Sequence, residues 1–126
     1  MDSLTVNAFV KDINKTIDFY KLLGFEVTMT VPEQGDLIWA MLSDASVTIM
    51  LQTFESLGKD LPDIDRKKSG GALIFYIKIK QIRSFFERIK NKVEVVKGLE
   101  KTFYGATEFT IKDVESFHLT FAEDEE

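Results

Sequence analysis

Few residues of this 126-residue chain have side chains that could carry out chemistry on their own. The chain contains one histidine, His118, and no cysteine, which excludes a multi-histidine metal site, a thiolate zinc site and a cysteine nucleophile. His118 could act as a general base, since imidazole changes its protonation state near neutral pH. Glu108 lies in a predicted strand beside the turn at Gly105 and could act as a base or bind a cation. For both residues, a position on a pocket wall or rim without a chemical role is the preferred interpretation.

The sequence lacks the other common catalytic and cofactor-binding motifs. It contains no serine-nucleophile motif, no phosphate-binding loop and no dinucleotide fingerprint. The pair Gly70-Gly71 precedes a predicted strand, whereas a phosphate site at a helix terminus requires a helix. Trp39 and Tyr76 are more informative, because they lie in predicted strands where a planar or cationic ligand could stack on their rings. Phe109 is predicted to pack in the core instead.

The composition indicates a globular protein with a core of its own. Apolar residues make up 44% of the chain, and 126 residues suffice for one domain rather than two. The net charge of −5 comes mostly from the acidic tail 123–126, which we expect to be a solvated chain end. Because basic residues are scattered along the chain, nucleic acid is not expected as the main partner. With no basic leader and no apolar stretch of about 20 residues, the sequence predicts a cytoplasmic protein without a membrane segment.

The stretch 10–27 predicts a strand, a helix and a second strand in direct succession. Asp12 or Asn14 can accept hydrogen bonds from the free amides of the first helical turn. Gly24 can adopt the left-handed conformation that ends a helix. The apolar residues of the helix recur at helical spacing and form one stripe: Ile13, Ile17, Tyr20 and Leu23.

The second half of the chain repeats this organisation. Alternating and apolar patterns predict strands over 4–10, 25–31, 37–42 and 46–53, and again over 72–79, 93–96, 104–111 and 117–122, with a second helix over 80–91. At a nearly constant spacing, the halves align as Val10 with Ile77, Phe19 with Phe86, Phe25 with Val93, Trp39 with Phe109, and Met50 with Thr120. The chain is therefore predicted to be a single α+β domain over 1–126, with module one over 1–53, a linker over 54–71, module two over 72–123 and the acidic tail 123–126.

Side-chain alternation gives the predicted strands two different faces. One face is uniformly apolar and should pack under the helices, because burial of apolar surface contributes roughly 25 cal/mol per Å². The other face is mixed and contains Thr5, Asn7, Phe9, Thr48, Met50, Gln52, Ala72, Ile74, Tyr76, His118 and Thr120. A few polar groups on a partly apolar surface are typical of a small-molecule pocket, although such side chains can also fill a small barrel or face solvent.

Short motifs in both halves carry a family resemblance. They are Val10-x-Asp12, Ile17-Asp18-Phe19-Tyr20 and Leu23-Gly24-Phe25, followed by Tyr104-Gly105, Glu108-Phe109, Asp113 and the alternation from Phe117 to Phe121. Together they resemble the vicinal oxygen chelate superfamily, which includes glyoxalase I, bleomycin-resistance proteins, fosfomycin-resistance enzymes and extradiol dioxygenases. The resemblance implies two βαβββ modules that form an incomplete eight-stranded curved sheet, with helices on the outer face and a pocket on the concave face. It also implies a homodimer.

In the metal-dependent members of that superfamily, His, Glu or Gln residues on the first, fourth, fifth and eighth strands bind the metal. Counted along this sequence, the corresponding positions are Thr5, Met50, Ala72 and Thr120. None of these is a usual ligand of Mn²⁺, Fe²⁺, Ni²⁺ or Zn²⁺, and a shift of two residues offers only Asn7, Gln52 and His118. The resemblance, combined with these residues, predicts no metal and no other cofactor.

The preferred hypothesis is a metal-free small-molecule binding protein, similar to the bleomycin-resistance proteins, whose ligand could be an antibiotic. The predicted ligand-binding residues are Thr5, Asn7, Trp39, Met50, Gln52, Tyr76, Glu108, His118 and Thr120, with no catalytic residue among them. One alternative is a lyase, isomerase or dioxygenase-type enzyme of the same superfamily. A purely structural or regulatory dimer is a third.

Overall fold

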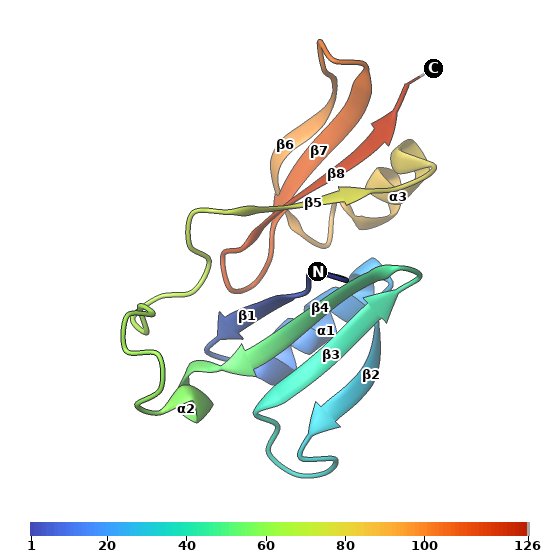
Figure 1. The fold of residues 1–126 in the computed structure, drawn as a ribbon. Helices are drawn as coiled ribbons and strands as arrows, with labels where there is room; N and C mark the ends of the chain where they lie inside the picture. The colour runs from blue at the N-terminus through green and yellow to red at the C-terminus, as the bar shows by residue number, and fades with distance from the viewer. Residues whose placement is uncertain (126) are drawn as a thin grey trace. The chain divides into compact units, whose positions relative to one another are not determined.

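The computed structural model describes residues 1–125 and shows an α+β chain built from two four-stranded sheets and their helices (Figure 1). The chain divides into two compact units, unit 1 over residues 1–69 and unit 2 from Gly70 onward. Each unit contains one β-α-β-β-β module, as the sequence predicts. The boundary falls inside the predicted linker, and the assignment of both modules to one domain stays a prediction.

In each sheet the last strand of the module lies in the interior. Unit 1 contains β1 (Val6–Val10), α1 (Ile13–Leu23), β2 (Glu26–Val31), β3 (Trp39–Asp44), β4 (Val47–Thr53) and the short helix α2 (Phe54–Leu57). Unit 2 contains β5 (Ile74–Lys78), α3 (Ile82–Ile89), β6 (Glu94–Lys101), β7 (Ala106–Lys112) and β8 (His118–Asp124). The strand orders are β1-β4-β3-β2 and β5-β8-β7-β6. Both β4 and β8 pair in parallel with the first strand of the module and antiparallel with the third.

Helix α1 begins and ends where the sequence predicts and covers one face of the unit 1 sheet (Figure 1). The Asp12 side chain accepts a hydrogen bond from the Lys15 amide at 3.1 Å, so Asp12 rather than Asn14 is the N-cap. Gly24 ends the helix with a φ of 117°, a left-handed conformation that glycine adopts without steric cost. All residues of the predicted apolar stripe are buried, which confirms the face on which the helix packs.

In unit 2, aromatic side chains join α3 to its sheet. Phe85 lies edge-on against Phe121 of β8, and Phe86 lies edge-on against Phe109 of β7, with ring centroids 4.9 Å apart in both pairs. Phe109 is 1% exposed, which confirms that it is a core residue. Truncation of such a ring to alanine typically costs about 3–5 kcal/mol, so these contacts fix α3 firmly on the sheet.

The predicted linker 54–71 is folded locally. It begins with α2, where the Thr53 hydroxyl accepts a hydrogen bond from the Ser56 amide at 3.1 Å. Further along, the Arg66 guanidinium donates hydrogen bonds to four backbone carbonyl oxygens, those of Gly58, Asp60, Leu61 and Ile64. One side chain therefore orders the loop, because it binds carbonyl oxygens that are not paired within a strand or a helix.

Most element boundaries lie within two residues of the predicted ones, but β6 differs more. The prediction that this strand ends before Gly98 was wrong, because β6 runs from Glu94 to Lys101. Gly98 lies in the irregular stretch of pairing between Lys97 and Glu100, where β6 bulges away from β7. A glycine inside a strand often marks such a bulge rather than a strand end.

The acidic end of the chain is part of the fold, which corrects the expectation of a solvated tail. Glu123 and Asp124 belong to β8. The Glu123 carboxylate accepts hydrogen bonds from the backbone amides of Gln81 and Ile82, at 2.8 and 3.1 Å. It thereby caps α3, because the N-cap residue Gln81 makes no capping hydrogen bond with its own side chain. Glu126 lies outside the described residues.

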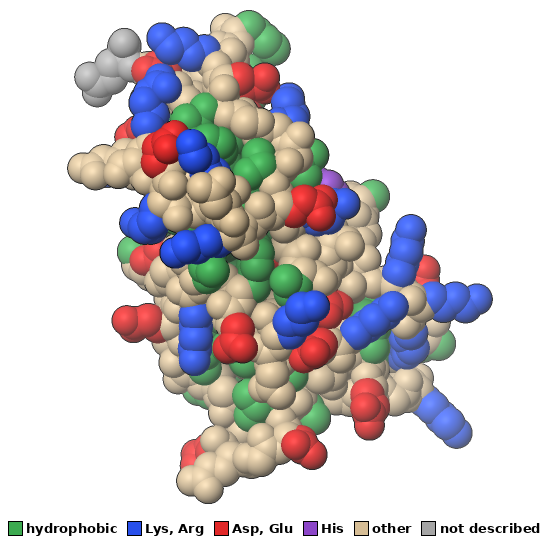
Figure 2. All heavy atoms as spheres, turned by 180° about the vertical axis from the view of Figure 1, so that it is seen from behind, with side chains coloured by type: hydrophobic (Ala, Val, Ile, Leu, Met, Phe, Trp, Pro, Cys, Tyr) green, Lys and Arg blue, Asp and Glu red, His purple; other side chains and the backbone are tan. Residues whose placement is uncertain are grey.

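Positive and negative side chains are mixed on the protein surface. Figure 2 shows Lys and Arg side chains interspersed with Asp and Glu, without a large area of one sign on the face that it draws. Opposite charges also meet in exposed ion pairs, such as Lys90 with Glu87 at 2.8 Å on α3. None of the described helices has the length and apolar character needed to cross a membrane.

Removal of the Glu123 cap is expected to destabilise unit 2 in a pH-dependent way. The two amide hydrogen bonds hold the pKa of Glu123 below its ordinary value. A carboxyl with a lowered folded-state pKa contributes stability above its unfolded pKa and loses that contribution as the pH falls through the folded pKa. Glu123→Gln should therefore lower the thermal midpoint at pH 7, and the difference from wild type should disappear in acid.

Glu87→Gln is the matched control for that measurement, because Glu87 is an exposed α3 carboxylate with an i,i+3 ion pair and no capping contact. Thermal unfolding of both variants from pH 3 to pH 7 distinguishes the effects. An equal loss in the two variants, or a loss in Glu123→Gln that persists in acid, would contradict the capping role.

Candidate functional site

In unit 1, the sheet face opposite α1 brings together four predicted site residues. Asn7 lies directly across from Met50, and Trp39 lies directly across from Gln52. Because Met50 and Gln52 are two positions apart on β4, all four side chains project from the same face. The intervening residues of β4 are buried on the α1 side, as the alternation predicts. Thr5 precedes β1 and lies outside this paired register.

A directional chain of hydrogen bonds orients the amides on this face. The Ser56 hydroxyl donates to the Thr53 carbonyl oxygen at 2.8 Å, since a carbonyl can only accept. Ser56 Oγ therefore accepts from Gln52 Nε2 at 3.1 Å, and Gln52 Oε1 accepts from Asn7 Nδ2 at 2.9 Å. The chain fixes which end of each amide carries the oxygen. It leaves Oδ1 of the exposed Asn7 as an acceptor for a hydrogen-bond donor from outside.

Apolar side chains border this amide chain. Met41 lies across from Met50 on the same face. Phe9, which lies across from Gln52, packs its ring against Phe54 of α2 with centroids 6.0 Å apart. Methionine side chains adapt to ligands of different shape, and aromatic rings stack on flat ones. The face therefore combines oriented polar groups with an adaptable apolar surround.

A groove of about 680 Å³ runs along β2 and is lined by residues 27–33. Within it, Met29 and Val31 are 57% and 44% exposed. Met29 lies across from Met41, and Val31 lies across from Trp39, so the groove continues the face that carries the indole ring. A ligand held against Trp39 can extend along β2 without meeting the helix-covered core.

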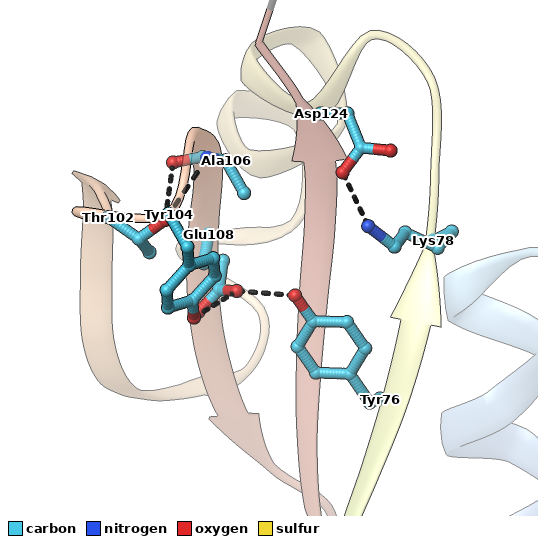
Figure 3. A network of polar contacts seen from close by, with 7 residues as sticks. All are labelled: Tyr76, Lys78, Thr102, Tyr104, Ala106, Glu108 and Asp124. Atoms are coloured by element: carbon cyan, nitrogen blue, oxygen red, sulfur yellow. Dashed lines mark hydrogen bonds and ion pairs between the residues drawn. The ribbon is translucent and has the colours of Figure 1, made fainter.

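In unit 2, the predicted site residues Tyr76 and Glu108 meet on the face opposite α3 (Figure 3). The Tyr76 hydroxyl donates a hydrogen bond to Glu108 Oε2 at 2.5 Å, and the Tyr104 hydroxyl donates to the same oxygen at 2.6 Å. Tyr76 lies on β5 and Glu108 on β7, so their contact spans β8. Ala122 of β8 lies across from Glu108, and its small side chain leaves room for the contact.

The turn between β6 and β7 positions the second tyrosine. Thr102 Oγ1 accepts a hydrogen bond from the Ala106 amide at 3.1 Å and donates one to the Ala106 carbonyl oxygen at 3.2 Å. Gly105 has a φ of 85°, which lets the chain reverse direction within this turn. Tyr104 is thereby held four residues before Glu108, with its hydroxyl over the carboxylate (Figure 3).

The carboxylate changes the acidity of both phenols. The hydrogen bond to Glu108 raises the pKa of Tyr76 and of Tyr104 above the ordinary phenol value, and desolvation and repulsion by the carboxylate charge add to this effect. Both hydroxyls therefore remain protonated donors at neutral pH. The arrangement holds one carboxylate between two phenol donors and leaves the second carboxylate oxygen, Oε1, without such a donor.

His118, the only histidine, is not part of this cluster. It lies across from Ile74 and Lys112 near the beginning of β8. Glu108 lies across from Ala122, four residues further along β8, which corresponds to a separation of about 13 Å along a strand. The structure therefore does not bring His118 and Glu108 together as an acid–base pair.

The positions predicted for metal ligands do not fit a metal ion. Ala72 has no donor atom, Met50 offers only a thioether, and Thr5 a hydroxyl. Thr120 is buried, and its hydroxyl already shares a hydrogen bond with Thr110 at 2.8 Å. Among residues 1–125, no group of three His, Asp or Glu side chains is placed to hold a metal ion. The donor set and its packing therefore both disagree with the metal site of the metal-dependent proteins that the sequence resembles.

Strand register corrects one pair in the internal alignment. Trp39 lies on the face opposite the helix of its module, whereas its predicted counterpart Phe109 lies under α3. In the strand register, Trp39 lies across from Gln52, two positions after Met50. Glu108 lies across from Ala122, two positions after Thr120. Trp39 and Glu108 therefore hold equivalent places, an indole in one module and a carboxylate in the other.

Two members of these clusters, Ser56 and Tyr104, were not among the predicted ligand-binding residues. Ser56 lies in α2, a helix of four residues within the predicted linker 54–71. The Thr53-x-x-Ser56 spacing is a capping signal that could have revealed it. Tyr104 is separated from Glu108 by a tight turn, and only the turn geometry brings the two together.

The sequence profile of the Glyoxalase/Bleomycin resistance protein/Dioxygenase superfamily matches residues 3–121. The chain belongs to this superfamily. Solved structures that share its fold include TioX from Micromonospora sp. ML1, 16% identical with a TM-score of 0.78, covering 98% of this chain and 99% of that one. A protein of unknown function from Agrobacterium tumefaciens str. C58 is 19% identical with a TM-score of 0.81, covering 98% and 94%. A bleomycin resistance determinant encoded on the transposon Tn5 is 19% identical with a TM-score of 0.69, covering 100% of both chains.

No curated protein sequence matches the chain. At the identities given above, the likeness to solved structures establishes the glyoxalase-superfamily fold, and the fold alone is shared by members with different chemistry. The function of this member therefore has to be argued from its own side chains.

Replacement of Glu108 should lower the pKa of both tyrosines toward the ordinary phenol value of 10.0. In Glu108→Gln the negative charge is lost, and the amide oxygen is a weaker acceptor than a carboxylate. A pH titration followed through the ring ¹³C signals of labelled tyrosine should show Tyr76 and Tyr104 ionising at lower pH than in wild type. Tyr20, buried in unit 1, serves as the internal control. An unchanged titration of Tyr76 would contradict the hydrogen-bonded cluster.

Proposed function

We propose that the protein is a metal-free small-molecule binding protein that holds its ligand without transforming it. The observation that carries the proposal is the Trp39 face of unit 1, which bears an oriented amide chain on β1 and β4 and, beyond β3, a groove of about 680 Å³ along β2. Volumes of roughly 300–1,000 Å³ and a mainly apolar lining with a few fixed polar groups are usual for small-molecule sites. The face has both properties.

The side chains on this face indicate the kind of ligand. The indole of Trp39 favours a flat ring system, and the methionines around it tolerate variation in shape. The acceptor on Asn7 favours a ligand with a hydrogen-bond donor at the edge of its ring. Antibiotics with planar heterocycles and amide groups satisfy these requirements, and one similar structure is a bleomycin resistance determinant.

The side chains give less support to an enzyme. Metal-assisted members of the superfamily polarise a substrate oxygen through ligands of the His or carboxylate type, whereas this chain has Thr, Met and Ala at the corresponding places. His118 and Glu108 lie too far apart along the sheet to share a proton. The net charge of −5 also favours a small ligand over nucleic acid. We further propose a homodimer, because β2 and β6 each end a sheet with an open strand edge.

Fluorescence titration tests the proposal directly. Trp39 is the only tryptophan, so its emission reports on this face alone. Titration with planar amide-bearing compounds, including nicotinamide and bleomycin, should give a saturable change for at least one compound. Ser56→Ala releases the Gln52 amide and should weaken that ligand by roughly fivefold, because one hydrogen bond contributes about 1 kcal/mol. Ser46→Ala, in the turn before β4, is the matched control and should leave the affinity unchanged.

Two results would overturn the proposal. The first is the absence of any fluorescence change across the panel at millimolar concentration. The second is a transition metal retained at one equivalent per chain through dialysis, which would favour a lyase, isomerase or dioxygenase-type enzyme of the superfamily. Metal analysis of the purified protein therefore accompanies the titration.

A further inference from the structure

Glu108 differs from the other carboxylates on its sheet face. Three ion pairs lie on or beside this face: Lys78 with Asp124 at 2.5 Å, Lys97 with Glu100 at 2.8 Å, and Lys112 with Glu94 at 3.4 Å. In each of them a lysine neutralises an acidic side chain. In the described part of the chain, Glu108 has no lysine or arginine within ion-pair distance, and its two partners are neutral phenols. Glu108 is therefore a carboxylate on this face without a direct ion-pair partner among the described residues.

The two tyrosines hold this charge in place without neutralising it. Both hydroxyls donate to Oε2, which leaves the lone pairs of Oε1 available. A carboxylate that is already oriented loses little side-chain entropy when it binds a further donor, so its contact with a ligand is preorganised. Two lysines on this face are engaged by other carboxylates, Lys97 by Glu100 and Lys78 by Asp124. The hydrogen bond to Glu100 raises the pKa of Lys97, and the charge of Glu108 adds to this rise without an ion-pair contact.

The phenol rings add a second attraction for positive charge. Tyr76 is 49% exposed and Tyr104 is 58% exposed, so a ligand can reach their rings. The Lys78 ammonium already lies 5.7 Å from the centroid of the Tyr76 ring, within the range of a cation–π contact. A cation can therefore lie against this ring, and the lysine that does so here is itself paired with Asp124. Phe103, fully exposed beside Tyr104 with centroids 5.1 Å apart, extends the aromatic surface.

We propose that Glu108, Tyr76 and Tyr104 form a binding site in unit 2 for the positively charged alkylammonium group of a small molecule. The ammonium would donate a hydrogen bond to Glu108 Oε1 and lie against the two phenol rings, so that charge and ring quadrupoles act together. This inference rests on the proposed small-molecule function and names the chemical class of ligand that the unit 2 face would take, a compound with an ionised amine. An anionic group at the same place would meet the carboxylate and be repelled.

A matched series of probes tests the charge preference on the wild-type protein. The probes are 2-phenylethylammonium, the neutral 2-phenylethanol and the anionic 3-phenylpropionate, which share a phenyl ring and a short chain. NMR of labelled tyrosine should show saturable shifts at Tyr76 and Tyr104 with the ammonium probe, weaker shifts with the alcohol and none with the carboxylate. Binding should weaken as salt is added, because the attraction includes two opposite charges. Equal shifts with the ammonium and the carboxylate would overturn the inference.

A pair of variants then assigns the preference to Glu108. Glu108→Gln keeps the size of the side chain and removes its charge, and it should weaken 2-phenylethylammonium binding by at least about fivefold. Glu94→Gln removes a charge that Lys112 already neutralises at the other end of β6, and it should change the affinity by less than about twofold. Equal losses in both variants would show a diffuse charge effect and overturn the binding site.

The result also separates this inference from the proposed function. If ligands change the Trp39 fluorescence but none of the amine probes responds to Glu108→Gln, the small-molecule function stands and the ammonium binding site is rejected. If neither face responds to any compound, both proposals are rejected. Chemical shifts of the backbone amides in Glu108→Gln confirm that unit 2 is folded in each experiment.

Discussion

The place of the last strand in each module is the constraint on which the rest of the structure depends. β4 and β8 lie between a parallel and an antiparallel neighbour, so their register fixes the register of the whole sheet. Leu51 and Leu119 are fully buried, and the residues that follow them, Gln52 and Thr120, point to the opposite face. A slip by one residue would expose the leucines and bury the amide. Hydrophobic burial under α1 and α3 therefore holds both polar clusters in place.

Local chemistry made much of this predictable from the sequence. Caps such as Asp12 and Gly24 act within a few residues, and the face on which Tyr76 lies follows from alternation alone. The partners of these side chains were not predictable, because the contact between Tyr76 and Glu108 joins two strands across a third. The contact depends on the strand register and on the small side chain of Ala122 between the two residues. Neither can be predicted from the sequence around Tyr76 or Glu108. The prediction of a solvated acidic tail was wrong for a related reason. Glu123 and Asp124 each bind a donor that lies far away in the chain.

The two modules show how one scaffold can carry different recognition chemistry. Trp39 and Glu108 hold equivalent places, yet one is an uncharged indole beside an amide chain and the other is a carboxylate between phenols. The helix-covered faces, by contrast, are apolar in both units. Burial thus constrains one face of each sheet and leaves the other free to vary, which is consistent with a superfamily that includes both enzymes and binding proteins.

The interior position of β4 and β8 also affects how the protein is made. A ribosome releases the chain from its N-terminus, so the strand that each sheet needs in its interior emerges after the strands on either side of it. Until Thr53 has left the exit tunnel, β1 and β3 of a nascent unit 1 lack the strand that pairs with both. In the same way, β5 and β7 lack β8 until Asp124 has emerged. Each module therefore passes through an interval with open strand edges and an uncovered apolar face. The length of that interval is the time between emergence of the third and the fourth strand of the module, during which chaperones and self-association compete for the unfinished sheet.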